Sequence, residues 1–121
     1  MLAGKSALVT GSVDGISFAI AEGLAASGCA VMLNGFAPAD RLEQQLRAIR
    51  AHGVQADYHG ADLSVPGQIE DLVAATEAAF GKIDIVVNNA VTRCYALVEE
   101  LTLEAWNYAL AVNLSAPFQI I

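Results

Sequence analysis

The sequence predicts an α/β fold: an open parallel sheet of four strands in the order 3-2-1-4, with flanking helices. Short apolar runs alternate along the chain with longer amphipathic stretches. This alternation is typical of parallel strands joined by right-handed helical crossovers. Hydrophobic residues make up 55% of the chain but aromatic residues only 7%, which favours buried strands packed on alanine-rich helices. The length of 121 residues indicates one domain over residues 1–121.

Residues 6–10 (SALVT) predict the first strand, because they form a short apolar run that ends at a glycine-containing turn. A helix is predicted over residues 15–27, and Gly28 is placed to end it. Apolar side chains recur on one face of this helix at a spacing of four residues: Ile16, Ile20 and Leu24. The spacing indicates an amphipathic helix.

Residues 30–34 (AVMLN) predict a second strand, and residues 54–59 predict a weaker third one. Between them, a helix is predicted over residues 40–52, with Gly53 as its terminator. Three apolar side chains are expected to form the buried stripe of this helix: Leu42, Leu46 and Ile49.

A third helix is predicted to begin at Pro66, whose ring suits a first helical turn, and to end before Gly81. Its buried face is expected to comprise Ile69, Leu72, Val73, Thr76 and Phe80. Residues 83–88 (IDIVVN) predict the fourth strand, because they are the most β-branched run in the chain. A last helix is expected to follow Thr102 as its N-cap and to run toward the C-terminus, with Glu104 in its first turn.

Polar segments follow the first and fourth strands, at residues 10–15 (TGSVDG) and 88–94 (NNAVTRC). Ligands of open parallel sheets bind beyond the carboxyl ends of the strands, where the strand order reverses. Gly11 would give a tight turn, and Gly15 would let a phosphate approach the unpaired N–H groups that open a helix. Taken alone, two glycines between a strand and a helix are a common pattern.

Three further polar positions each have a structural and a functional interpretation. The pair Asn88–Asn89 either ends a strand or holds a ribose, and Asp62 either caps a helix or accepts from an adenine amino group. Asn113 is polar within an otherwise apolar helix, which is also expected of an exposed position. Each structural interpretation is plausible singly, but the positions together fit one known arrangement.

The combined pattern resembles the short-chain dehydrogenase/reductase family. The residues that carry the resemblance occur in the family's order along the chain: Thr10-Gly11 with Gly15-Ile16, Asp62-Leu63, Asn88-Asn89-Ala90, Thr102 to Trp106 and Val112-Asn113-Leu114. The resemblance implies a Rossmann-like sheet and an oxidoreductase that transfers a hydride between a nicotinamide cofactor and a secondary alcohol or ketone.

The resemblance also implies roles for individual residues. In the cofactor site, Gly11, Gly15 and Ile16 would line the pyrophosphate and ribose, and Asp62 and Leu63 would hold adenine. The segment Asn88-Asn89-Ala90 would stabilise the sheet and flank the cofactor ribose. Phe36, after the second strand, is a further candidate for cofactor binding. Asn113 corresponds to the asparagine of the family's catalytic set, whose backbone holds a water in a proton relay. No metal site is predicted.

NAD is the expected cofactor, although NADP stays open. A 2′-phosphate favours Arg or Lys near the adenosine ribose, whereas here Asp14 precedes Gly15 and its carboxylate would repel a phosphate. The second strand ends in Asn34-Gly35-Phe36 without an acidic residue that would bind a free 2′-hydroxyl. Arg41 is close enough in sequence to reach back to this site, so the residues allow both cofactors.

Two positions depart from the family pattern. Ser17 stands where the loop has its third glycine, and Val91 stands where the glycine of Asn-Asn-Ala-Gly is usual. If Val91 required a positive φ, its side chain would be strained by about 1–3 kcal/mol. We therefore expect both residues to weaken cofactor binding.

Two short segments are similar to bacterial D-3-hydroxybutyrate dehydrogenases: LNGF (residues 33–36), where the second strand ends, and NLSAPF (residues 113–118). Arg93 is a weak candidate for contacting a substrate carboxylate. The family's catalytic Ser and Tyr-x-x-x-Lys pair would follow this region. None of the three tyrosines here has a lysine four residues later. We expect a chain truncated before those residues, with negligible dehydrogenase activity by itself. The alternatives are a non-catalytic NAD-binding module and an inactive remnant.

Composition narrows the classes of partner. The net charge of −7 and the lack of clustered Lys and Arg argue against nucleic acid, and no run is apolar enough for a membrane span or signal peptide. The two cysteines are expected to be reduced side chains of a cytoplasmic protein. The expected partner is a small hydroxy acid or ketone. Self-association, as a homo-oligomer, is expected through the exposed edge of the fourth strand.

Overall fold

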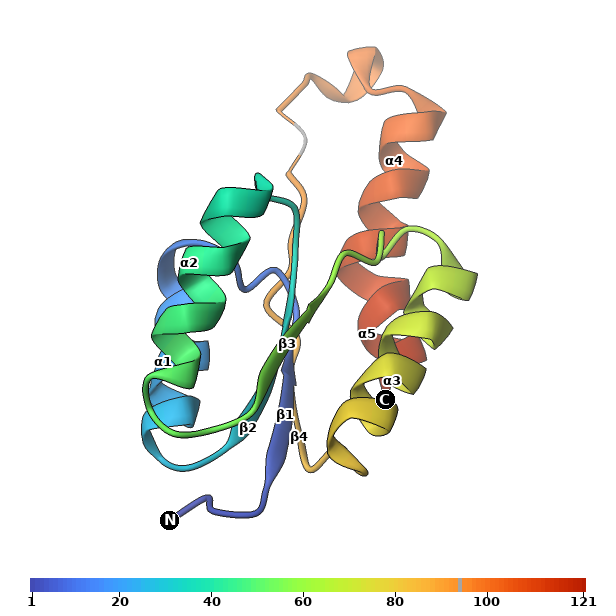
Figure 1. Ribbon diagram of the computed structural model, residues 1–121. Coiled ribbons are helices and arrows are strands. Elements are labelled where there is room, and N and C mark those ends of the chain that lie inside the picture. Colours follow the sequence, from blue (N-terminus) through green and yellow to red (C-terminus); the bar gives the residue numbers. More distant parts are fainter. Residues whose placement is uncertain (94) are drawn as a thin grey trace.

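The computed structural model describes residues 1–93 and 95–121 and contains a four-stranded parallel sheet with helices on both faces (Figure 1). The strands are β1 (Ser6–Val9), β2 (Ala30–Asn34), β3 (Ala56–His59) and β4 (Ile85–Val87). Their order is β3-β2-β1-β4, so the predicted order 3-2-1-4 is confirmed. All three pairs are parallel, with Leu8 opposite both Met32 and Val86.

Helices α1 (Gly15–Ala26) and α2 (Ala39–Arg50) cover one face of the sheet, and α3 (Pro66–Phe80) and α5 (Ala116–Ile120) cover the other (Figure 1). Helix α4 (Leu103–Leu110) extends beyond the carboxyl end of the strands and is preceded by a 3₁₀ turn (Val98–Glu100). A π-helical turn (Ala111–Ser115) joins α4 to α5. The single last helix of the sequence prediction is therefore two helices joined by a π turn.

Local signals explain several helix ends. Thr102 accepts a hydrogen bond from the N–H of Ala105 at 3.1 Å, which confirms it as the cap of α4. Pro66 opens α3, and Gly81 ends it with φ of +85°, as predicted. The fourth strand is shorter at both ends than the predicted residues 83–88, and just before it the Asp84 carboxylate accepts the Ser6 N–H at 2.9 Å.

The core has two layers, one on each face of the sheet. Leu8 and Met32 pack with residues of α3 and α5, whereas Val9, Val31 and Leu33 pack with residues of α1 and α2. This division follows from the strand period, because neighbouring side chains point to opposite faces. The free thiol of Cys29 is buried, and burial raises its pKa. Cys94 lies outside the described residues.

The face of α1 that packs most deeply differs from the sequence prediction. Ser17, Ala21 and Ala25 are its buried residues, whereas Ile16 is 80% exposed. Small side chains let the helix axis approach the sheet closely, and the larger Ile20 and Leu24 lie at the margin of this contact, half-buried. Within the described residues, no helix is long and apolar enough to span a membrane.

Candidate functional site

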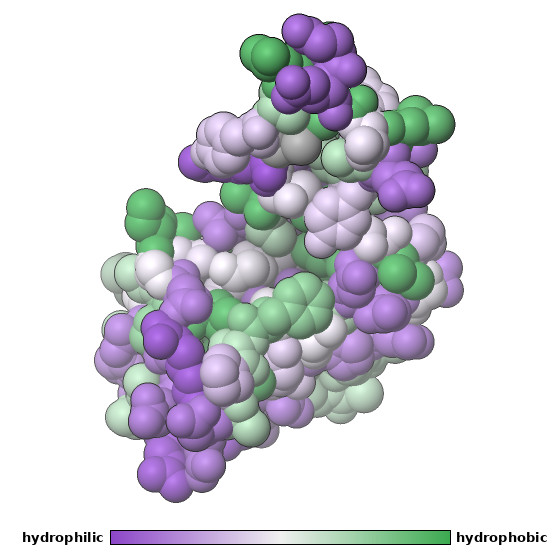
Figure 2. All heavy atoms as spheres, turned by 90° about the horizontal axis from the view of Figure 1, so that it is seen from above, coloured by the Kyte–Doolittle hydropathy of each residue, from purple (hydrophilic) through white to green (hydrophobic). Residues whose placement is uncertain are grey.

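A cleft of about 330 Å³ lies at the carboxyl ends of the strands. Figure 2 looks onto this end of the molecule, where the surface is hollowed. The loops after all four strands and the α4 region contribute its lining: Gly11, Val13 and Asp14; Asn34 to Phe36; Ala61 to Leu63; Asn89 to Thr92; Tyr108 and Val112. The segments after β1 and β4, more than seventy residues apart, thus meet at one site as predicted.

The loop between β1 and α1 has the form of an anion cradle. Gly11 has φ of +61°, and a Cβ there would lie 2.9 Å from the Cα of Ala90, so this contact between the two loops requires glycine. Gly15 has φ of +60°, and a Cβ there would point into open space. The N-cap residue Asp14 makes no side-chain hydrogen bond to the start of α1, which leaves its first N–H groups to an anionic ligand.

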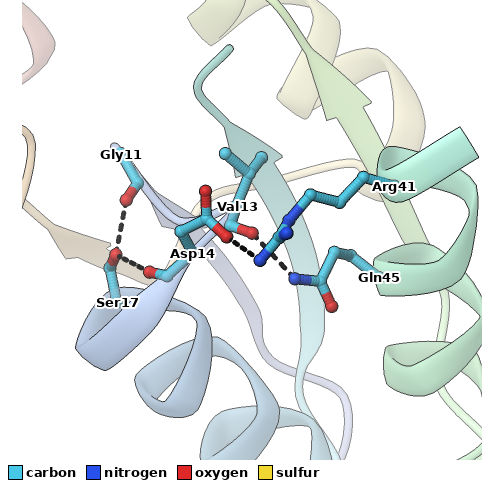
Figure 3. A network of polar contacts seen from close by, with 6 residues as sticks. All are labelled: Gly11, Val13, Asp14, Ser17, Arg41 and Gln45. Carbon is cyan, nitrogen blue, oxygen red and sulfur yellow. Dashed lines mark hydrogen bonds and ion pairs between the residues drawn. The ribbon is translucent and has the colours of Figure 1, made fainter. Parts of the chain in front are cut away.

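Ser17 stabilises this loop. Ser17 is only 5% exposed. Its hydroxyl lies within hydrogen-bond distance of the carbonyls of Gly11 and, at 2.8 Å, of Asp14 (Figure 3), and its one hydrogen is shared between these two acceptors. No non-glycine residue among those described has a positive φ, so Val91 does not carry the backbone strain considered above. The hydroxyl at position 17 ties the two ends of the loop together.

Asn34, which the sequence analysis did not select as a site residue, holds three of the loops that form the cleft. Its buried amide donates to the carbonyls of His59 (3.0 Å) and Ala61 (3.2 Å) and accepts from the N–H of Gly11 (3.3 Å). The backbone of Asn34 also exchanges hydrogen bonds with Ser12. The sequence did contain a signal for this role, because Asn34 is the polar residue that ends the apolar run AVMLN.

Thr10 has a similar role between β1 and β4. Its buried hydroxyl accepts from the N–H groups of Asn89 (3.1 Å) and Ala90 (3.0 Å), and its own N–H donates to the carbonyl of Val87 (3.1 Å). The Asn89–Ala90 turn is therefore held directly against Gly11, so the two loops form one wall of the cleft.

Asp62 lies in the cleft with its carboxylate oriented by the following turn. One oxygen, Oδ1, accepts from the N–H (2.9 Å) and the hydroxyl (2.6 Å) of Ser64, and these bonds lower the pKa of Asp62. The second oxygen is the acceptor that an adenine amino group would require. Leu63 beside it is buried and Phe36 is exposed at the rim, so the wall has apolar surface as well.

Asn113 lies in the π turn, and its side chain pairs with the loop after β4. Its Oδ1 accepts from the N–H of Thr92 at 2.9 Å, and its Nδ2 donates to the carbonyl of Thr92 at 2.8 Å. The amide thus reproduces a backbone ladder contact between segments 21 residues apart. π turns interrupt the regular helical hydrogen-bond ladder and are frequent at functional sites.

The cleft contains most of the predicted cofactor residues. Gly11, Asp14, Phe36, Asp62, Leu63, Asn89 and Ala90 line it, whereas Gly15, Ile16, Arg93 and Asn113 do not. Ile16 and Arg93 are both exposed, and Gly15 opens α1 beside the cleft. The lining residues that prediction missed include Asn34 and Tyr108, both brought in by the packing of distant segments.

A parallel sheet binds nucleotides in the crevice where its strand order reverses, and here that crevice, between β1 and β4, meets the glycine loop that opens α1. By class, therefore, the fold is an open parallel sheet of the Rossmann type. Residues 5–121 match the family described as short chain dehydrogenase. The chain belongs to this family.

Named relatives agree with this assignment. The chain is 42% identical over 118 residues to the D-beta-hydroxybutyrate dehydrogenase of Cupriavidus necator, which covers 98% of this chain and 45% of the relative. It is 37% identical to the enzyme of that name from Rhizobium meliloti, covering 97% and 46%. The chain spans about half the length of these curated relatives.

A solved structure is similar over the same region. A short chain dehydrogenase from Burkholderia cenocepacia, in complex with NADP, superposes with a TM-score of 0.93 at 37% identity. The match covers 98% of this chain and 49% of the other.

Proposed function

We propose that these 121 residues are the N-terminal, dinucleotide-binding part of a nicotinamide-dependent oxidoreductase of the 3-hydroxybutyrate dehydrogenase type. The proposed cofactor is NAD, and the proposed substrates are small hydroxy acids and their ketones. The observation that carries the proposal is the start of α1, where Gly15 has φ of +60° with open space at its Cβ position and the N-cap residue Asp14 makes no side-chain hydrogen bond to the helix. The similarity to two D-beta-hydroxybutyrate dehydrogenases supports the substrate class.

In this proposal, the pyrophosphate binds to the first N–H groups of α1, flanked by Gly11 and Ile16. Partial positive charge at a helix N-terminus favours an anion, and glycine lets it approach the backbone. The open space at the Cβ position of Gly15 supports this role, because a side chain there would extend into it.

The adenosine end is assigned to the loops after β2 and β3. Asp62 accepts from the adenine amino group while Leu63 and Phe36 provide apolar contact. An ordinary aspartate is already ionised at neutral pH, and the two Ser64 donors lower the pKa of Asp62 further, so its carboxylate is an acceptor. Asn89 and Ala90 flank the second ribose, at the turn that Thr10 holds in place.

When bound, the nicotinamide supplies the hydride acceptor or donor. We assign Asn113 to positioning a water for proton transfer through its main chain, since the π turn interrupts the helical ladder and the side chain is already engaged by Thr92. Hydride transfer to a ketone also needs a proton donor at the oxygen. Among these 121 residues no tyrosine has a lysine four positions later, so we propose binding without turnover for this chain by itself.

Titration of the chain with NAD, followed by calorimetry and thermal unfolding, tests the proposal. Ligand at about 100 times Kd stabilises the folded state by about 2.7 kcal/mol. Gly15→Ala should weaken binding, whereas Gly53→Ala should not, although both glycines have positive φ and open space at Cβ. No stabilisation by NAD would favour an inactive remnant. NAD-dependent oxidation of 3-hydroxybutyrate by the chain alone would contradict the proposed absence of turnover. Binding of NAD without oxidation is the result expected here, and it is also expected of a non-catalytic NAD-binding module.

Two further parts of the proposal concern the chain's setting. A cytoplasmic location is proposed from the cysteine content, because reduced cysteines are typical of that compartment. Self-association is proposed through β4, which is an edge strand whose three residues are half-buried and apolar. A single monomeric peak in size-exclusion chromatography at high concentration would contradict the second.

A further inference from the structure

Two side chains of α2 hold the loop that opens α1. Arg41 forms an ion pair with the carboxylate of Asp14, and Gln45, one turn later, donates from Nε2 to the carbonyl of Val13 at 2.8 Å (Figure 3). The same loop is tied from the other side by Ser17. Helices on both sides therefore hold the main chain of this loop, and Arg41 holds the Asp14 carboxylate.

The charges around the cleft make this ion pair important. The described residues that line the cleft include two carboxylates, Asp14 and Asp62, and no Lys, Arg or His. Arg41 does not line the cleft itself, but its guanidinium contacts a lining carboxylate. The guanidinium of Arg41 is thus already paired within the protein.

The pair is also open to exchange. The side chains of Arg41 and Asp14 are 52% and 56% exposed. Exposed ion pairs contribute little stability and are screened by salt. A competing anion that reaches Arg41 can therefore displace the carboxylate without disrupting the fold.

We propose that Asp14 selects against a 2′-phosphorylated cofactor by occupying Arg41, so that the pair, rather than the Asp14 charge alone, sets the preference for NAD. This inference rests on the nucleotide-binding function proposed above. A 2′-phosphate carries nearly two negative charges at neutral pH and is well matched to a guanidinium. To gain that contact it must displace Asp14, which would then lie unpaired beside the phosphate and repel it. A free 2′-hydroxyl requires no such displacement.

The two ways in which Asp14 could act are separable. If its charge simply repels phosphate, removing that charge improves NADP binding whether or not Arg41 is present. If Asp14 acts by occupying Arg41, the improvement requires Arg41. A double-mutant cycle over the two positions measures this dependence directly.

The experiment compares Asp14→Asn, Arg41→Gln and the double variant with the original 121-residue chain. Affinities for NAD, NADP, 5′-AMP and adenosine 2′,5′-bisphosphate are measured by calorimetry at low ionic strength. Glu43→Gln is the matched control, because it also removes one negative charge from an exposed ion pair of α2, that with Arg47. Asp14→Ser is a second variant at the same position, and thermal unfolding checks that each variant is folded.

Asp14→Asn is expected to tighten NADP and adenosine 2′,5′-bisphosphate about tenfold, the scale of a freed charge-assisted hydrogen bond. NAD and 5′-AMP should change by less than about twofold, as should every ligand in Glu43→Gln. In the Arg41→Gln background, removing Asp14 should give less than about a twofold gain for NADP.

An equal gain with and without Arg41 would overturn the inference while leaving NAD binding intact. No gain for NADP in Asp14→Asn, or a preference of the original chain for NADP, would overturn it as well. Binding of none of the four ligands to the original chain would overturn the proposed nucleotide-binding function and this inference together.

Discussion

Replacing Ser17 with alanine removes the hydroxyl that closes the loop at the start of α1. The hydroxyl donates to the carbonyls of Gly11 and Asp14 in a position that is only 5% exposed. The Asp14 carbonyl keeps the N–H of Phe18 at 3.3 Å, so the main cost falls on the Gly11 carbonyl. Leaving a fully buried acceptor without its donor costs about 1–3 kcal/mol, and because the bond to Gly11 is only half-buried we expect a cost in the lower part of this range, about 1.5 kcal/mol. For a domain of this size that is about 6 °C in Tm.

Urea unfolding followed by circular dichroism measures this change, with Ser27→Ala as the matched control. The Ser27 hydroxyl also donates to a helix carbonyl, that of Gly23 at 3.1 Å, but it is exposed, so its removal should cost less than about 0.5 kcal/mol. Ser17→Gly restores the family's glycine and should cost about 0.5–1 kcal/mol more than alanine, through backbone entropy. If Ser17→Gly were as stable as the original chain and bound NAD more tightly, Ser17 would be a weakening substitution after all.

Two further changes test the cleft. Gly11→Ala should destabilise the fold by more than the roughly 1–2 kcal/mol expected of positive φ alone, because its Cβ would lie 2.9 Å from the Cα of Ala90. Gly4→Ala is the control, because a Cβ at Gly4 meets nothing within 4 Å. Equal unfolding midpoints for the two variants would be inconsistent with the contact between Gly11 and Ala90. Asp62→Asn should lower stability at neutral pH by less than about 1 kcal/mol, the range of exposed charges. Hydrogen bonds from Ser64 lower the pKa of Asp62 below 3.8, so the carboxylate's contribution is complete above that pH and is lost as the pH falls through the lowered pKa. Urea midpoints of both chains should therefore converge in acid, and a constant difference would argue against this source of stability.

Much of the fold was predictable because its signals are local. Helix α3 begins at Pro66 and ends before Gly81 as predicted, since both residues act through their own backbone geometry. The order of the strands followed from the alternation of strands and helices, which leaves few allowed connections. The glycines of the loop after β1 were recognisable for the same reason, because their spacing between a strand and a helix needs no knowledge of distant residues.

Other features depended on contacts that no local pattern encodes. The break of the last helix into α4, a π turn and α5 accompanies the pairing of Asn113 with Thr92, 21 residues earlier. The role of Asn34 required its amide to meet two other loops. The contacts of Ser17 also depended on the fold, because a missing glycine carries no signal that the hydroxyl replacing it would reach the carbonyls of Gly11 and Asp14.

By itself, the sequence determined the fold class, the strand order and the family, because these depend on hydrophobic periodicity and on motifs whose residues are near neighbours in the chain. Only the tertiary structure decided which charges and amides meet at the cleft. Asp14 as read from the sequence is a free carboxylate beside a phosphate loop, but in the fold it is paired with Arg41, 27 residues away. The physical reason is that side-chain pairing depends on how helices pack on the sheet, and packing brings together residues whose separation along the chain carries no signal of their contact.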